Sequence, residues 1–227
     1  MEFGLAGGFL IDSYMKTKLE SFNAKSFDRS IYTLWTASAR LEQNTLNNKQ
    51  YATKGFKRYL IGQFIQGLES YRYPDSIGHL SKLDASLMYF QVSGGFERYK
   101  AMSENFILGT KGEFVFNDKR KLDNYTSSVV QAPAFTPTPH SVVSFNEAYR
   151  SNQFLAMGIM PIWQLKPNLY LRNEFYGFFP WSGLSRGGNQ EVLITHSWKN
   201  FQYIAESAVV FNLPFTSINS KYHIIIP

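Results

Sequence analysis

Long stretches of this chain alternate apolar and polar residues with a period of two, and this pattern constrains the fold more than any other feature. It is clearest at 31–42, 86–98, 106–117, 169–179 and 201–213, where ionisable or polar groups fall on one face and aromatic or aliphatic groups on the other. Such alternation predicts β-strands with two chemically different faces. Only the short stretch "KAMSEN" separates the second and third of these segments, so we predict that they form an antiparallel hairpin.

The predicted strands are longer than those of ordinary soluble sheets. They run to about ten residues or more, against about 5 to 6 in soluble proteins, and a strand that crosses a bilayer needs about 9 to 11. Arg172 and Glu174 lie in the middle of one strand on its polar face, as a watery lumen would allow, and bulky aromatic residues gather at 175–181 like an interfacial girdle. We therefore expect an all-β, antiparallel transmembrane β-barrel.

About ten strands can be counted in the sequence. The chain is interpreted as one barrel domain fragment over 1–227, with a long proline-rich loop at 124–141. Short connections alternate with long ones, as on the two rims of an outer-membrane barrel. The predicted strands are 3–12, 14–23, 31–43, 56–73, 84–99, 106–118, 142–164, 167–179, 190–199 and 201–213.

The loop at 124–141 includes "VVQAPAFTPTPHS", in which three prolines interrupt residues that otherwise favour strands. A proline has no amide donor and forces the preceding residue into an extended conformation, so the segment cannot lie inside a hydrogen-bonded ladder. We expect it to be an exposed loop on the long-loop rim. His140 lies in this loop, where we expect it to hydrogen-bond the loop rather than bind a metal.

Composition narrows the classes of partner. Cysteine is absent, which excludes disulfides and thiolate metal sites, and the net charge of +6 comes from lysines and arginines scattered toward segment ends. This distribution argues against a nucleic-acid groove and favours a solvated rim or an anionic lipid surface. No uninterrupted apolar run is long enough for a transmembrane helix, and the first residues make a poor signal peptide.

Two segments resemble a known family. "QAPAFTPTPHSVVSFNEAYRSNQFLAMGIMPIWQLKPNLYLRNEFYGF" (131–178) and "LNNKQYATKGFKRYLIGQF" (46–64) are similar to the C-terminal barrel region of bacterial patatin-like phospholipases. That region belongs to the surface-antigen superfamily of Gram-negative outer-membrane barrels. The resemblance extends over most of the chain from about residue 40 and is most specific at "AFTPTPHS" and "YATKG".

The resemblance implies an anchoring or translocating barrel of about sixteen strands, preceded by a patatin hydrolase domain that this chain lacks. It implies the cell outer membrane as location and, as partners, its lipid and lipopolysaccharide, the barrel assembly machinery and the hydrolase domain, with a homodimer left open. Arg150 matches the arginine with which related proteins tuck a loop tip into the lumen; facing water or pairing with Glu147 is the alternative. The end "FTSINSKYHIIIP" loses the alternation, so we expect a truncated or frame-shifted end and a barrel that does not close by itself.

Catalytic and metal sites find little support in the sequence. Ser185 lies in a GxSxG pattern, but a strand pattern follows it instead of the helix of a nucleophile elbow, so we expect a Gly/Ser turn and no catalytic residue. The histidines show no ligand spacing, and we expect no metal or cofactor. Glu113, Glu174 and Glu206 are expected to face the lumen, solvated or paired with Arg172. A soluble serine hydrolase using Ser185 and a soluble β-sandwich that binds carbohydrate are the two alternative functions.

Overall fold

A computed structural model of the chain describes residues 2–14, 28–74, 80–120, 122, 125–187, 192–196 and 200–212. Eight of its strands form one antiparallel sheet in the order β1-β2-β3-β4-β5-β6-β7-β10, and β8 and β9 form a separate two-stranded hairpin. The eight strands are β1 (Glu2–Tyr14), β2 (Asp28–Asn44), β3 (Gly55–Pro74), β4 (Leu80–Ala101), β5 (Phe106–Asn117), β6 (Gln153–Lys166), β7 (Leu169–Pro180) and β10 (Gln202–Phe211). The hairpin consists of β8 (Ser182–Arg186) and β9 (Val192–His196).

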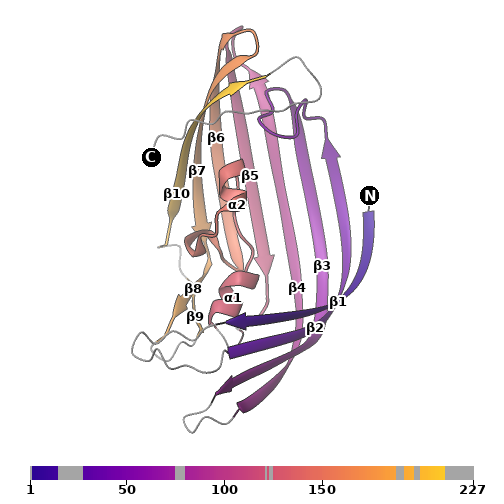
Figure 1. The fold of residues 1–227 in the computed structure, drawn as a ribbon. Helices are drawn as coiled ribbons and strands as arrows, with labels where there is room; N and C mark the ends of the chain where they lie inside the picture. The colour runs from indigo at the N-terminus through magenta and orange to yellow at the C-terminus, as the bar shows by residue number, and fades with distance from the viewer. Residues whose placement is uncertain are drawn as a thin grey trace.

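The sheet curves into an open arc with β1 and β10 at its edges (Figure 1). The all-β antiparallel prediction is confirmed. Closure of the sheet into a barrel is not shown, because within the described residues β1 pairs only with β2 and β10 only with β7. The predicted hairpin is present as β4 and β5, whose paired residues include Gln91 with Asn117 and Ala101 with Ile107.

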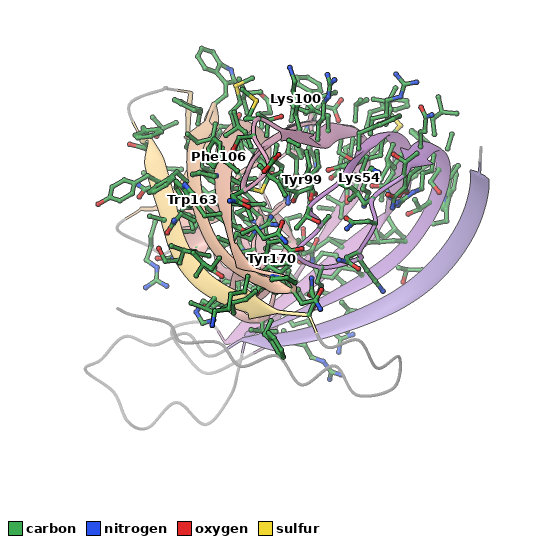
Figure 2. All side chains as sticks on the ribbon, turned by 90° about the horizontal axis from the view of Figure 1, so that it is seen from above. Lys54, Tyr99, Lys100, Phe106, Trp163 and Tyr170 are labelled. Atoms are coloured by element: carbon green, nitrogen blue, oxygen red, sulfur yellow. The ribbon has the colours of Figure 1, made fainter. Side chains whose placement is uncertain are left out.

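Alternation along each strand gives the sheet two faces. In Figure 2 the arc is seen from above, with Tyr99 and Tyr170 on its inner, concave side. Most concave positions are buried or half-buried, with Tyr32, Glu69 and Tyr176 among the fully buried ones, whereas the neighbouring convex positions are mostly exposed. The period-two pattern therefore predicted correctly which residues share a face.

The prediction of an exposed proline loop was wrong. The chain between β5 and β6 contains α1 (Tyr125–Gln131), α2 (Pro139–Val143) and the short 3₁₀ helix η1 (Glu147–Tyr149), which lie against the concave face (Figure 1). We call residues 118–152 the inner segment. Phe135, Val129 and Ala132 are almost completely buried. Phe135 covers aromatic residues of the sheet, whereas Val129 packs against Val192 of β9. The prolines do keep the segment out of the ladder, but they do not keep it in solvent.

Two predicted strand boundaries also need correction. The strand predicted at 142–164 begins at Gln153, because Thr138 and Ser141 form a capping box that starts α2 with Pro139 in its first turn. The strand predicted at 190–199 is the five-residue β9. Most of the strand predicted at 14–23 lies outside the described residues, as does the chain end from residue 213.

Candidate functional site

The concave face contains a buried ion pair between two predicted site residues, Arg172 and Glu174 of β7. Both side chains are about 5% exposed. Arg172 also donates from Nη2 to the Tyr99 hydroxyl (2.8 Å), and Glu174 accepts from the Tyr176 hydroxyl (2.7 Å). The predicted pairing is confirmed, but the expectation of a watery surrounding was wrong, since protein atoms cover both groups. Hydrogen bonds take the place of water around these charges.

Arg172 also holds the connection between β2 and β3, residues 45–54, against the inside of the sheet. Its Nη1 donates to the carbonyl of Ala52 (2.8 Å), and its guanidinium lies 5.6 Å from the ring centre of Tyr51. Both loop residues are buried, Ala52 in the main core cluster and Tyr51 against Ala208 and Val210 of β10. The loop thus crosses from the β2–β3 side of the arc to the β7–β10 side.

Buried polar contacts fix the start of the inner segment to the strands. The Tyr32 hydroxyl donates to Glu69 (2.8 Å) and contacts the hydroxyl of Ser127 on α1. Lys119 donates to the Gln131 side chain at the end of α1 (2.6 Å). Lys119 is 7% exposed, and burial lowers the pKa of its ammonium group to about 8, an effect that the negative charge of Glu69 partly offsets.

Arg150 organises the inner segment from within. Its guanidinium donates to the carbonyls of Val130 (2.7 Å) and Ala132 (3.1 Å), at and just beyond the end of α1, and packs 4.6 Å from the ring centre of Phe145. A cation at a helix C-terminus satisfies carbonyls that have no partner inside the helix. Within the described ranges no ion pair joins Arg150 to Glu147, so that alternative for Arg150 was wrong.

Phe135 forms the centre of the packing between the inner segment and the sheet. Its ring stacks on Phe178 (centroids 5.9 Å apart, planes at 13°) and meets Phe154 and Tyr176 edge-on. Its backbone N–H donates to the Tyr149 carbonyl (2.9 Å). A cluster of four aromatic rings therefore occupies the part of the concave face where a wide channel would need water.

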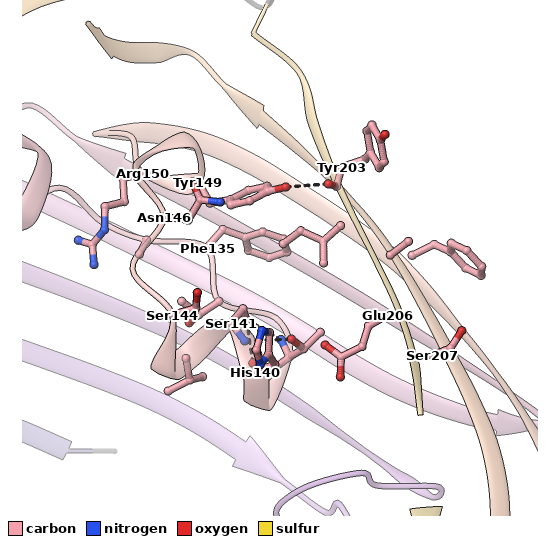
Figure 3. Close-up of a pocket in the computed structure, with 17 residues that line it drawn as sticks. Phe135, His140, Ser141, Ser144, Asn146, Tyr149, Arg150, Tyr203, Glu206 and Ser207 are labelled. Carbon is pink, nitrogen blue, oxygen red and sulfur yellow. Dashed lines mark hydrogen bonds between the residues drawn. The ribbon is translucent and has the colours of Figure 1, made fainter. Parts of the chain in front are cut away.

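A cavity of about 750 Å³ lies between the inner segment and the edge strand β10. Figure 3 shows His140 of α2 and Glu206 of β10 on opposite walls of this cavity. His140 is exposed, and no hydrogen bond to the loop is found for it, contrary to the prediction. Glu206 lies on the concave face as predicted, as does Glu113 of β5, which is half-buried. We call this cavity the β10 groove.

Ser185 lies on β8 and is exposed, and its hydroxyl donates to the Leu193 carbonyl (3.4 Å) across the hairpin. The strand β9, not a helix, is the next described element after it. Both observations agree with the sequence in placing no nucleophile elbow here. The predicted Gly/Ser turn is instead part of a strand, because Ser185 pairs with Leu193.

The convex face is apolar and exposed. Charged side chains on it lie toward strand ends, as with Arg58 and Arg72 of β3, whereas the convex positions at 60–70 of β3 and 86–96 of β4 carry no charge. The two charge-free spans lie side by side, because Leu60 pairs with Gly94 and Leu68 with Ser86. The exposed large apolar residues of this face include Trp35, Leu60, Leu68, Met88, Phe90, Phe96, Phe114, Phe116, Met157, Ile159, Trp163, Phe175, Val209 and Phe211.

In the part of the chain that the structure describes, no group of three or more histidine or acidic side chains is placed to hold a metal ion; His79, His223 and the side chain of His196 fall outside that part. No described helix has the length and apolar character that crossing a membrane requires.

Comparisons with protein-family models, with curated proteins and with solved structures find no match to this chain. The site residues that the sequence did not indicate include Phe135 of the inner segment and Tyr51 and Ala52 of the 45–54 loop. In the sequence, Phe135 stands out only as an apolar residue between prolines. Tyr51 and Ala52, which are buried in the structure, stand out only as two apolar residues in a polar loop. Neither stands out by spacing alone.

Proposed function

We propose that this chain is the membrane-embedded wall of an outer-membrane β-barrel, which anchors a patatin-like phospholipase. The observation that carries the proposal is the charge-free belt of the convex face at 60–70 and 86–96. Each span is about 11 residues long, the length that a tilted strand needs to cross the hydrocarbon layer. Leaving so large an apolar surface in water would be unfavourable.

The charged side chains near the strand ends support an orientation in which the convex face lies toward the hydrocarbon layer. Arg72 and Lys82 face each other across β3 and β4 toward one rim, and Arg58 and Arg98 lie toward the other. Long basic side chains at such positions reach the head groups while their stems stay in the apolar layer. Lipid and lipopolysaccharide, whose phosphates are anionic, are thus the partners that this face fits. Nucleic acid is not, because the cations form two rims rather than one stripe.

The choice of patatin-like phospholipases rests on the resemblance of 46–64 and 131–178. These stretches form most of the 45–54 loop, most of the inner segment, the first half of β3, all of β6 and most of β7. They include Arg172 with its partners Ala52 and Glu174, and the Phe135 cluster, so the resemblance lies where the packing is most demanding. The hydrolase domain and the barrel assembly machinery are the partners that this assignment carries with it.

Anchoring is favoured over passage of a substrate. The inner segment and the 45–54 loop pack the concave face between β5 and β10 with aromatic rings and a buried ion pair. A translocating barrel would have to move these parts, at the cost of exposing Phe135 and the partners of Arg172. Translocation therefore remains the second candidate.

Flotation tests the proposal. The full chain, refolded from denaturant into liposomes, should float with them in a density gradient and stay bound after washes with urea and with alkaline carbonate. With a reporter esterase fused before residue 1, the esterase activity should float as well. Recovery of a folded, monodisperse protein in buffer without detergent would contradict the proposal, and so would removal from the liposomes by either wash.

A further inference from the structure

The outer edge of β10 has backbone groups without a strand partner. Asn212, just after β10, donates its N–H to the Asn168 carbonyl (2.8 Å). Because hydrogen-bonded positions alternate along an antiparallel strand, the backbone N–H and C=O groups of the even-numbered residues of β10 point toward β7. The N–H and C=O groups of the odd-numbered residues 203, 205, 207, 209 and 211 therefore point to the other side. Within the described residues no strand pairs with that side.

One of these groups already accepts a hydrogen bond. The Tyr149 hydroxyl donates to the Tyr203 carbonyl (2.7 Å), as the dashed line in Figure 3 shows. Tyr149 belongs to η1 of the inner segment, so the segment satisfies the first edge carbonyl and leaves those from Ala205 onward to another partner. This contact independently supports the backbone phase deduced from Asn212.

The β10 groove lies along the same edge. Tyr203, Ala205 and Ser207, whose backbone groups face outward from the edge, line it together with Glu206 and with His140 of the opposite wall. A strand laid along this edge would direct alternate side chains into the groove, toward the Glu206 carboxylate, and the others to the apolar convex side. Phe135 closes the bottom of the groove.

We propose that the β10 groove seats an added β-strand from another polypeptide segment, paired antiparallel with β10 from Ala205 to Phe211, with a basic residue facing Glu206 and apolar residues on the convex side. This inference deepens the proposed function, on which it rests, because unpaired backbone groups are strongly unfavourable inside the hydrocarbon layer. The basic residue follows from charge, since Glu206 is the one formal negative charge among the residues that line the groove.

A cross-linking experiment on the full chain in detergent micelles tests this inference. The chain has no cysteine, so Ser207→Cys introduces a single thiol on the convex side of the edge. The probe is a synthetic ten-residue peptide that alternates valine with threonine, with one central lysine among the threonines and one cysteine among the valines. Cα atoms of directly paired residues are about 5.5 Å apart, within the range for a disulfide. We expect a disulfide between peptide and protein.

Two controls separate strand pairing from adsorption. The same peptide N-methylated at alternate amides cannot form the ladder and should not cross-link, and equal cross-linking of both peptides would overturn the proposal. In Glu206→Gln the yield with the lysine peptide should fall by up to about fivefold, while a peptide with threonine in place of lysine should be unaffected. Loss with both peptides would contradict the assigned role of Glu206.

The remaining outcomes are equally decisive. A disulfide-linked dimer of Ser207→Cys formed in preference to the peptide adduct would assign the edge to a second copy of the chain and overturn the proposal. Failure of the lysine peptide to cross-link would overturn it as well. Neither result bears on the proposed function, which is tested by flotation of the unmodified chain. If flotation fails and cross-linking succeeds, the membrane proposal is wrong and the proposal of an added strand at β10 stands.

Discussion

On the concave face between β5 and β10, charged and aromatic side chains are buried under the inner segment and the 45–54 loop, whereas on the convex face aromatic and aliphatic side chains project with no described segment over them. Arg172 is 5% exposed and Phe178 is completely buried, while Met88 is 65% and Phe90 55% exposed. A soluble sheet does the reverse, because it packs its apolar face and shows its polar face to water.

This difference shows that alternation specifies which residues share a face but not what covers each face. The exposed apolar side chains of the convex face support the proposed membrane. Between β5 and β10, the concave face needs neither lipid nor bulk water, because Ala52, Tyr99 and the inner segment supply the hydrogen bonds and contacts. The two faces should therefore respond differently to the same kind of substitution.

The largest effect is expected for Arg172→Met on the concave face. It leaves Glu174 buried without its cation and frees the Ala52 carbonyl, so unfolding in micelles should become easier by about 3 to 5 kcal/mol. The matched control is Arg98→Met on the convex face, expected to change the free energy of unfolding by about 0.5 kcal/mol or less. Urea titration of both variants measures this, and equal effects would refute the contrast.

A new charge on the convex face should have the next largest effect. Met88→Arg places a cation in the middle of the charge-free belt and should cost about 2 to 4 kcal/mol in lipid. The control variant is Lys100→Arg, near the end of β4, which should cost almost nothing because it keeps the charge near the rim. Unfolding in liposomes measures both variants. If Met88→Arg leaves the free energy of unfolding unchanged, water and not lipid faces this position.

The concave side should show a dependence on pH through Lys119, which lies after the end of β5. Its pKa falls from 10.5 in the unfolded chain to about 8 in the folded protein, so between these values the unfolded chain binds more protons. Stability should therefore rise as the pH increases from 8 to 10.5, by up to about 3 kcal/mol. In Lys119→Gln this contribution to the rise should vanish. An unchanged pH profile in that variant would argue against the burial of Lys119.

The smallest effect is expected at the start of α2. Thr138→Ala removes the hydroxyl that accepts from the Ser141 N–H and should cost about 1 kcal/mol, whereas Thr138→Ser should cost less. The loss should be local, so we expect faster cleavage by proteases between 136 and 146 and unchanged protection of β3. Protection lost equally in both places would show that the inner segment and the sheet unfold as one unit.

The sequence predicted the sheet well because side-chain alternation is a local property. The faces of β2, β4, β5, β7 and β10, the β4–β5 hairpin and the pairing of Arg172 with Glu174 could all be deduced from spacing. The inner segment could not, because its burial depends on contacts between Phe135 and Phe154, Tyr176 and Phe178, which lie 19 or more positions away. Prolines indicate only that a segment does not pair as a strand within a β-sheet.

The site residues divide in the same way. Arg150 was predicted from a resemblance to a loop-tip arginine, and it does lie in the segment that folds inward, but its bonds to the carbonyls of Val130 and Ala132 follow from the position of α1, which no period indicated. His140 was predicted from its proline neighbours and lines the β10 groove, a cavity that exists only because β10 comes next to β7 in the sheet.

Fluorescence quenching of a single tryptophan tests the central claim, that the convex face meets hydrocarbon. Trp35 of β2 projects from this face and is 44% exposed, and replacing Trp163, Trp181 and Trp198 with phenylalanine isolates its signal. In liposomes of lipids brominated along the acyl chain, the emission of Trp35 should be strongly quenched and should resist aqueous iodide. Quenching by iodide with no effect of the brominated chains would contradict the account.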